Sequence, residues 1–569
     1  MEAHLRRAGR QRPDFSHCHL ALQTQGQAGM YVIHFMISIS ACLCLALILA
    51  ANASAADWPQ WGGRNARNFV SAEKNLPAEF HLAARAAGPA QGKKLPPKNI
   101  KWTAGLGTQT YASPTVAGGR IIIGTNDERL DDPRLPKTQG GLLLCFQEAT
   151  GERLWQLRVP RLKTRNTKFN YDNMGLGICS SAVIEGNRAY VVSSRGEVLC
   201  LDVAGQSNGN DGPYTDEGLY MARTTELPDK PGRFSVSATP PDPAPVKLQP
   251  TDGDIVWLYD FIKELDVWPQ DAVDCSILVY GDYLIACVSN GVDQSHKNVP
   301  SPNAPDLIVL EKKTGRLVAV NDQPIGSRIF HGEWSSPSLI DADGRPLIVW
   351  GGGDGVCYAF DARIKPVANG ATGRLERVWW FDCNPEHNKF KDGKPLPYSK
   401  DNQGPSEIIA TPVTSGNRIY VAVGQDSRHG EGPGCFSCID ATGRGDITQS
   451  GKVWQCFEVD RSFSSASVVD GLVFIADYSR EVRCLDAATG VVYWTHKLPA
   501  HPFGSTLAAD GKVYIGDESG RVTVLACSRE KQVLAVNRLD APIFTTPVAA
   551  NGVLYIATQK TLYAIQSQP

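Results

Sequence analysis

The chain is a succession of short apolar or alternating runs, each followed by turn residues. Between residues 465 and 498 this pattern predicts four strands, over 465–469, 472–477, 481–486 and 491–498. Asp470-Gly471 separates the first two strands and is a strong hairpin signal, while Gly490 allows the positive φ of a tight turn. Trp494 follows four residues after that glycine. The stretch is therefore expected to form one antiparallel four-stranded unit.

The same unit recurs along the chain. Copies begin near residues 113, 180, 275, 336, 411, 465, 505 and 546. The eighth copy ends at Ile565 after three strands, and an isolated strand, 100–104, lies near the start of the chain. Repeated four-stranded units predict an all-β fold that is a single eight-bladed β-propeller. We expect strand 100–104 to complete the last blade and close the ring.

One tryptophan recurs at the same place in the unit. The members are Trp102, Trp155, Trp257, Trp379, Trp454 and Trp494. An aromatic stripe could form a carbohydrate platform, but one tryptophan per blade favours a structural slot between neighbouring blades. Cysteines also recur at one repeat position, where Ala359 stands in one copy, and this indicates small buried packing sites rather than a disulfide framework.

The sequence divides into three parts. Residues 1–55 are predicted to be an N-terminal extension and signal peptide, 56–99 a leading segment, and 100–569 the propeller, with a Pro- and Gly-rich insertion over 203–252. The insertion is expected to be a flexible excursion. Near-zero net charge, −2 over 569 residues, gives no reason to expect a nucleic-acid partner, and a soluble monomer is expected.

The apolar run 31–51 precedes Ala53-Ser54-Ala55, a pattern typical of a signal-peptidase site. We therefore expect export to the periplasm or cell envelope, with no membrane span after cleavage. A retained membrane anchor is the alternative, and Cys42 also ends a lipoprotein-like box. Translation from either Met1 or Met30 is compatible with this interpretation.

One face of the propeller is expected to bind the ligand, because the long loops 126–140, 161–177, 263–274, 290–306, 384–408 and 425–434 fall on it. Residues just before the innermost strands should ring the channel mouth there. The predicted ligand-binding residues are Tyr111, Asp271, His331, Glu333, Trp334, Glu407, Arg461 and His501, with Asp172, Asn173 and Phe503 beside them. This polar and aromatic set suits a small polar ligand or a cation. The alternative is a water-filled funnel whose polar residues satisfy loop backbone.

A separate candidate is a calcium loop formed by Asn208, Asn210, Asp216 and Glu217, which offer oxygen ligands. It departs from the EF-hand because Gln206 stands at the first ligand position. The sequence contains no HExxH.

The repeat S-P-x-V…G-x-x-Y-V…C/A-L-D-A-x-T-G-x-x-x-W resembles the tryptophan-docking repeat of pyrroloquinoline-quinone (PQQ) dehydrogenases and their non-enzymatic relatives, over about 57–565. Residues 57–61, Asp-Trp-Pro-Gln-Trp, resemble the start of exported PQQ-like propellers of planctomycete type. The resemblance implies an eight-bladed propeller and leaves two functions open.

The first function is that of an exported, non-catalytic scaffold that binds a protein partner or a small polar ligand, as in the propeller lipoprotein of the outer-membrane assembly machinery. The second is a PQQ-dependent oxidoreductase of alcohols or sugars that also uses calcium. The enzymatic relatives hold the quinone against two adjacent bonded cysteines, and this sequence has no Cys-Cys dipeptide. We therefore favour the non-catalytic function, without a cofactor.

Overall fold

The computed structural model describes residues 56–85, 94–162, 174–223, 243–365, 367, 370–398 and 403–568. The predictions for the signal peptide (1–55), for Asp172 and Asn173, and for residues 224–242 of the insertion lie outside these residues.

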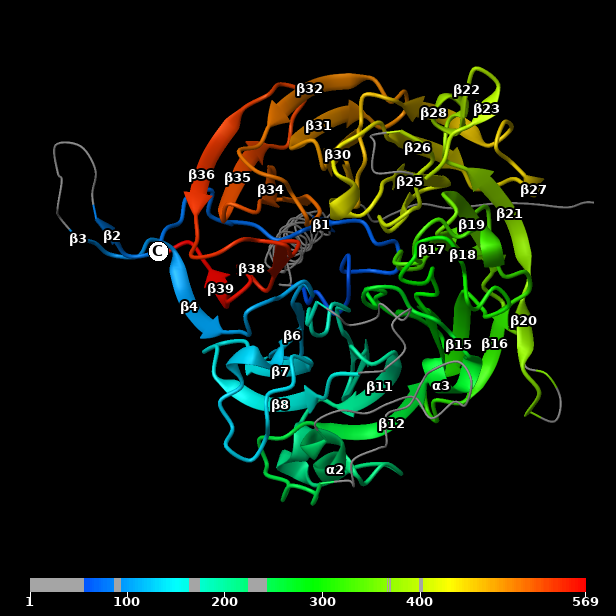
Figure 1. Cartoon of the computed structure of the whole chain (residues 1–569). Helices are drawn as coiled ribbons and strands as arrows, with labels where there is room; N and C mark the ends of the chain where they lie inside the picture. The colour runs from blue at the N-terminus through cyan, green and yellow to red at the C-terminus, as the bar shows by residue number, and fades with distance from the viewer. Residues whose placement is uncertain are drawn as a thin grey trace, which may run out of the picture. The chain divides into compact units, whose positions relative to one another are not determined.

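Eight predominantly antiparallel sheets follow one another around a ring, as the sequence repeat predicts (Figure 1). Blade 1 holds β5 (Thr115–Ala117), β6 (Arg120–Asn126), β7 (Gly141–Gln147) and β8 (Arg153–Val159). Blade 2 holds β9 (Val183–Glu185), β10 (Arg188–Val192), β11 (Glu197–Asp202) and β12 (Asp254–Asp260). Blade 3 holds β13 (Leu278–Tyr280), β14 (Tyr283–Cys287), β15 (Leu307–Glu311) and β16 (Leu317–Asn321), with β20 (Gly373–Leu375) added at its outer edge. Blade 4 holds β17 (Ser338–Asp341), β18 (Pro346–Gly351), β19 (Val356–Asp361) and β21 (Arg377–Asp382), with β27 (Gly445–Asp446) at its outer edge.

The remaining blades repeat the arrangement. Blade 5 holds β24 (Val413–Ser415), β25 (Arg418–Val423), β26 (Cys435–Asp440) and β28 (Lys452–Cys456). Blade 6 holds β29 (Ser467–Val469), β30 (Leu472–Asp477), β31 (Glu481–Asp486) and β32 (Val492–Lys497). Blade 7 holds β33 (Leu507–Ala509), β34 (Lys512–Gly516), β35 (Arg521–Ala526) and β36 (Val533–Arg538). Blade 8 holds β37 (Val548–Ala550), β38 (Val553–Ala557), β39 (Thr561–Ile565) and β4 (Ile100–Gly105).

Helices and the other strands in the described residues are short. They are η2 (Asp127–Arg129), η3 (Gly205–Asn208), α2 (Glu217–Ala222), α3 (Phe261–Leu265), η4 (Gly326–Arg328), α4 (Glu386–Lys389), η6 (Ser427–His429), and the strands β1 (Val70–Ser71), β2 (Ala84–Arg85), β3 (Lys94–Leu95), β22 (Phe390–Lys391) and β23 (Lys394–Pro395). Of the helices described, none has the length and apolar character needed to cross a bilayer.

The start of the insertion contains helices where the sequence predicted a flexible excursion. Residues 205–222 form η3 and α2, and Tyr220 and Met221 of α2 are buried in the same core as blade 1. Arg158 of β8 donates to the carbonyl oxygens of Met221 and Arg223. The expectation of a flexible excursion is therefore wrong for this part, because its apolar residues pack.

Blade 6 shows how local sequence sets the strands. β30 and β31 have the bounds that the sequence predicts. Asp470 and Gly471, at φ 50° and 75°, form the turn between β29 and β30. Positive φ at both central residues gives a turn whose twist matches that of the strands it joins.

The strand near the N-terminus closes the ring. β4 pairs antiparallel with β39, and Trp102 lies opposite Ala564. The chain thus supplies the outer strand of blade 8 from its beginning and the three inner strands from its end (Figure 1).

A belt of hydroxyl groups runs around the channel, formed by the Ser or Thr that begins each repeat. In seven of these residues the backbone N–H donates to the corresponding hydroxyl oxygen of the next blade, at 2.8–3.0 Å. The donors are Ser113, Ser181, Ser276, Thr411, Ser465, Ser505 and Thr546. The bond from Thr546 to Ser113 links the last blade to the first. The Ser of the S-P-x-V motif therefore joins neighbouring blades.

The recurrent tryptophans contact the blade that follows their own. Each indole Nε1–H donates to a backbone carbonyl in the following blade or its loop: Trp102 to Glu148, Trp155 to Val203, Trp257 to Lys312, Trp379 to Ala441, Trp454 to Ala487 and Trp494 to Ser528. Turn glycines lie against some of the rings. A Cβ on Gly315 would lie 2.4 Å from Trp257, which explains a residue without a side chain there.

The leading segment lines the inside of the ring. Between Trp58 and Glu73 it hydrogen-bonds to the inner part of every blade, from the Trp58–Val116 bridge on blade 1 to the bond from Gly552 N–H to Glu73 on blade 8. On the way, β1 pairs parallel with β33 of blade 7. The segment therefore holds the blades together from within.

Arg67 is the central contact of this segment. It is fully buried and donates to the carbonyl oxygens of Trp61, Ile277 and Pro337 at 2.6, 2.7 and 3.0 Å. These oxygens belong to the segment itself and to blades 3 and 4.

Replacing Arg67 with methionine is expected to lower the free energy of unfolding by about 2–4 kcal/mol, because buried carbonyl oxygens would lose their donors. Arg67→Lys, which keeps one charged donor, should lose less. Urea denaturation of the two variants measures the difference. Equal stability of wild type and Arg67→Met would contradict a central role for this side chain.

Candidate functional site

A cavity of about 270 Å³ opens in the channel, and the hydroxyl belt lines part of it. Its aromatic lining consists of Trp61, Tyr111, Trp334, Phe463, Phe503 and Phe544, and its charged lining of Asp271, Asp274, Asp426 and Arg428. Tyr111 stacks on Phe544 with ring centroids 5.2 Å apart. Ligand sites commonly combine such an apolar wall with a few convergent polar groups.

Trp61 brings the leading segment into the cavity wall. Its indole N–H donates to Thr411 Oγ1 at 3.0 Å, and its ring packs edge-on against Phe69 at 4.8 Å. The cavity wall therefore depends on the path of the leading segment inside the ring.

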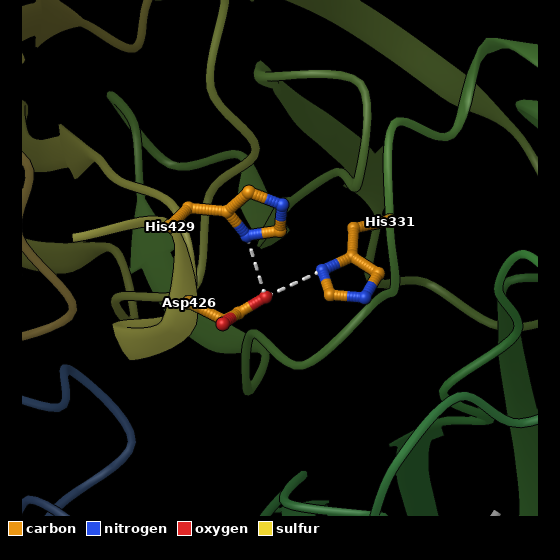
Figure 2. A group of neighbouring side chains, drawn as sticks. All are labelled: His331, Asp426 and His429. Atoms are coloured by element: carbon orange, nitrogen blue, oxygen red, sulfur yellow. Dashed lines mark hydrogen bonds and ion pairs between the residues drawn. The ribbon is translucent and has the colours of Figure 1, made fainter. Parts of the chain in front are cut away.

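Two histidines meet one carboxylate beside the cavity (Figure 2). Asp426 Oδ2 lies 2.8 Å from Nδ1 of His331 and 2.8 Å from Nδ1 of His429. Asp426 caps η6, whose last residue is His429, and this local turn fixes the pair. His331 comes from the loop that precedes β17, in the neighbouring blade. The cluster thus bridges blades 4 and 5.

The charges in this cluster support one another. Burial acts to raise the pKa of Asp426, but hydrogen bonds from both histidines hold it far below its usual range. Burial also opposes the charged form of His331, yet the hydrogen bond and charge of Asp426 raise the pKa of His331. His331 is almost fully buried, whereas Asp426 is partly exposed toward the cavity.

Glu407 and Tyr398 extend the cluster. The Tyr398 hydroxyl donates to Glu407 Oε1 at 3.0 Å and lies 3.3 Å from His331 Nδ1. Glu407 is fully buried, which raises its pKa to about 7. Its Oε2 has no hydrogen-bond partner among the described residues.

The predicted site residues fall into four groups, of which the buried pair Glu333 and Arg461 is described below. Tyr111, Asp271 and Trp334 line the cavity, as does the neighbouring Phe503. His331 and Glu407 lie in the cluster next to the lining residue Asp426. His501 stands apart, with Nδ1 2.6 Å from the carbonyl oxygen of Tyr478.

Glu333 and Arg461 are fully buried, so the expectation that they sit at a solvated mouth is wrong. Arg461 donates to the carbonyl oxygens of His429 and Gln403, and therefore satisfies loop backbone. Burial and the adjacent Asp306 raise the pKa of Glu333 well above its usual range. Residues just before an innermost strand therefore include both side chains that line the channel cavity and side chains that are fully buried.

Sequence reasoning missed Trp61, Tyr398, Asp426 and His429. The last two lie in the predicted loop 425–434, and their i, i+3 spacing was the only local signal. Trp61 belongs to the segment 57–61 that carries the resemblance, but no local pattern there indicates that the leading segment enters the channel.

The candidate calcium loop shows a different pattern. Glu217 is fully buried and accepts hydrogen bonds from the Asn210 amide at 2.9 Å and from Ile255 N–H at 3.3 Å. Asn208 and Asp216 are exposed. Glu217 already has protein partners, and calcium binding by this loop stays a prediction.

Comparison with known proteins agrees with this architecture. Residues 437–532 match the family described as outer membrane protein assembly factor BamB. The repeat over these residues is therefore PQQ-like, and the chain has the β-propeller fold. Quinohemoprotein alcohol dehydrogenase from Comamonas testosteroni is 12% identical, with a TM-score of 0.54 over 92% of this chain and 82% of that one. The Pseudomonas putida HK5 enzyme ADHIIG, also a quinohemoprotein alcohol dehydrogenase, gives 11% identity, a TM-score of 0.54 and the same coverage.

BamB from Moraxella catarrhalis is 14% identical over 82% of this chain and 97% of that chain, with a TM-score of 0.47. No curated protein matches the chain in sequence. At 11–12% identity, the likeness to the two dehydrogenases shows the β-propeller fold alone.

Without a cation between its carboxylates and the quinone, the cavity lining does not fit PQQ. The quinone is a planar tricarboxylate, and the charged lining presents Asp271, Asp274 and Asp426 against the single guanidinium of Arg428 among the described residues. Like charges would meet on binding. The cysteines in the described residues are free, most of them buried, and none is adjacent to another in the sequence.

Proposed function

We propose that this PQQ-like propeller is an exported, non-catalytic protein of the cell envelope that binds a small polar ligand in its channel cavity. The observation that carries the proposal is the lining, in which aromatic rings face three carboxylates around one cavity. Rings stack on the apolar faces of a ligand, while carboxylates accept hydrogen bonds from hydroxyl or amino groups. A neutral polyol or an amine therefore fits better than an anion.

The ligand is best sought by the rise in melting temperature that binding causes. Full-length protein is tested against mono- and disaccharides, small amines, and PQQ with Ca²⁺. A saccharide or amine should stabilise the wild type, and Asp271→Asn and Phe544→Ala should each weaken its binding about tenfold or more.

His501→Asn is the matched control. His501 is one of the predicted ligand-binding residues, but it does not line the cavity, so its replacement should leave ligand binding unchanged. Stoichiometric uptake of PQQ with substrate-dependent dye reduction would overturn the proposal. So would ligand binding that is unchanged in Asp271→Asn and Phe544→Ala.

A protein partner is the second candidate, supported by the match of residues 437–532 to the BamB family. Exposed apolar side chains occur within or just after this range, with Val491, Val533 and Val536 about half exposed. Partner capture lost in Val533→Lys with Val536→Lys, but kept in Phe544→Ala, would favour this outer surface over the cavity.

A further inference from the structure

Four atoms that could act as metal ligands lie close together beside the cavity. Asp426 Oδ2 lies 2.8 Å from Nδ1 of both His331 and His429, and these three atoms lie within 4.8 Å of one another. Tyr398 Oη lies 3.3 Å from His331 Nδ1 and 3.4 Å from His429 Nδ1. Ligands about 2.0–2.1 Å from a tetrahedral metal ion are separated by roughly 3.3 Å. Small movements would therefore let these atoms enclose an ion.

The imidazole of His331 has the outer partners that a ligand needs. Its Nε2 lies 3.3 Å from the Gln270 amide nitrogen, and the Gln270 Oε1 atom is buried without a partner. Rotating this amide by 180° would set Oε1 against an Nε2–H donor and leave the Nδ1 lone pair for a metal ion. His296 Nε2, 3.1 Å from the same Nε2, offers a second acceptor.

Glu407 supplies an independent observation. Its carboxylate is fully buried, Oε1 accepts from the Tyr398 hydroxyl, and Oε2 has no partner among the described residues. An unsatisfied buried carboxylate oxygen is costly. A cation held by the neighbouring residues would supply the missing positive charge and polarise the Tyr398 hydroxyl toward Glu407.

We propose that His331, His429, Asp426 and Tyr398 bind a divalent transition metal ion of the Zn²⁺ type, with Glu407 and Gln270 as outer partners (Figure 2). Two imidazole nitrogens favour such an ion over Ca²⁺ or Mg²⁺, which take mainly oxygen ligands. Because Asp426 and Asp271 both line the cavity, the ion would stand in its wall. This site goes beyond the proposed ligand binding and does not depend on it.

The test uses the full chain, freed of metal with a chelator and titrated with Zn²⁺ in a calorimeter. One tight site is expected, and Co²⁺ at that site should give the visible absorption of four-coordinate Co²⁺. Asp426→Asn and His429→Asn should each weaken Zn²⁺ binding about 100-fold and abolish that absorption, while Ca²⁺ and Mg²⁺ should not compete.

Two kinds of control keep the test decisive. His501→Asn should bind Zn²⁺ as the wild type does, because His501 contacts Tyr478 and not the cluster. If an Asp426 or His429 variant fails to fold by circular dichroism, Tyr398→Phe, which removes one donor oxygen, should still weaken binding about tenfold.

Absence of Zn²⁺ binding in the wild type would overturn the site. Binding that persists unchanged in the folded cluster variants would do the same, since it would come from elsewhere, such as His17, Cys18 and His19. Saccharide or amine binding is measured separately, on the metal-free protein. Phe544→Ala should weaken that binding without changing Zn²⁺ binding, because Phe544 is not a metal ligand, so the two proposals can fail independently.

Discussion

Removing residues 1–106 is expected to turn a well-folded propeller into a low-melting, aggregating chain. The truncation takes away β4, and β39 then presents unpaired N–H and C=O groups along an open edge. Such edges pair readily with other chains. The same truncation removes the leading segment, whose bonds to all eight blades would otherwise restrain the ring.

Size-exclusion chromatography with light scattering and a thermal melt compare the chain 107–569 with the full chain. A peptide of residues 56–106, added during refolding, should restore the monomer and raise the melting temperature, whereas a scrambled peptide should not. A truncated chain that stays monomeric and melts like the full chain would show that the closing strand is dispensable.

Trp379→Ala is expected to lower the free energy of unfolding by about 3–5 kcal/mol, the usual cost of truncating a large buried aromatic side chain. Trp379 is completely buried, packs in the core between blades 4 and 5, and donates to the carbonyl oxygen of Ala441. Its loss removes apolar contacts and leaves a cavity at the junction between two blades.

The neighbouring Trp380 gives a matched control on the same strand. It is only partly buried and lies beside Arg377, whose guanidinium stands 4.7 Å from its ring. Trp380→Ala should cost clearly less, about 1–2 kcal/mol, because it loses a cation–π contact and only part of a buried surface. Chemical denaturation of both variants measures this difference, and equal losses would contradict the assignment of Trp379 to a dedicated slot.

The sequence by itself determined the blades, because each blade is built from residues near one another in the chain. The Asp470-Gly471 turn and the apolar runs around it specify β29 to β31 through local backbone geometry. The tryptophans were predictable for the same reason, since each recurs at a fixed distance from its turn. Even ring closure followed from counting strands, because blade 8 lacked one and residues 100–104 supplied it.

Only the tertiary structure decided which polar side chains meet at the channel. His331 and Asp426 come from different blades, and their contact depends on how two loops fold over neighbouring sheets. Glu333 and Arg461 occupy similar places in the repeat and are fully buried, and Arg461 bonds to carbonyl oxygens of two loops. Trp61 reaches the cavity because the leading segment follows the inside of the ring. A repeat pattern encodes contacts within a blade, whereas loops and the leading segment lie outside that pattern, so their meeting points are fixed by packing across the whole ring.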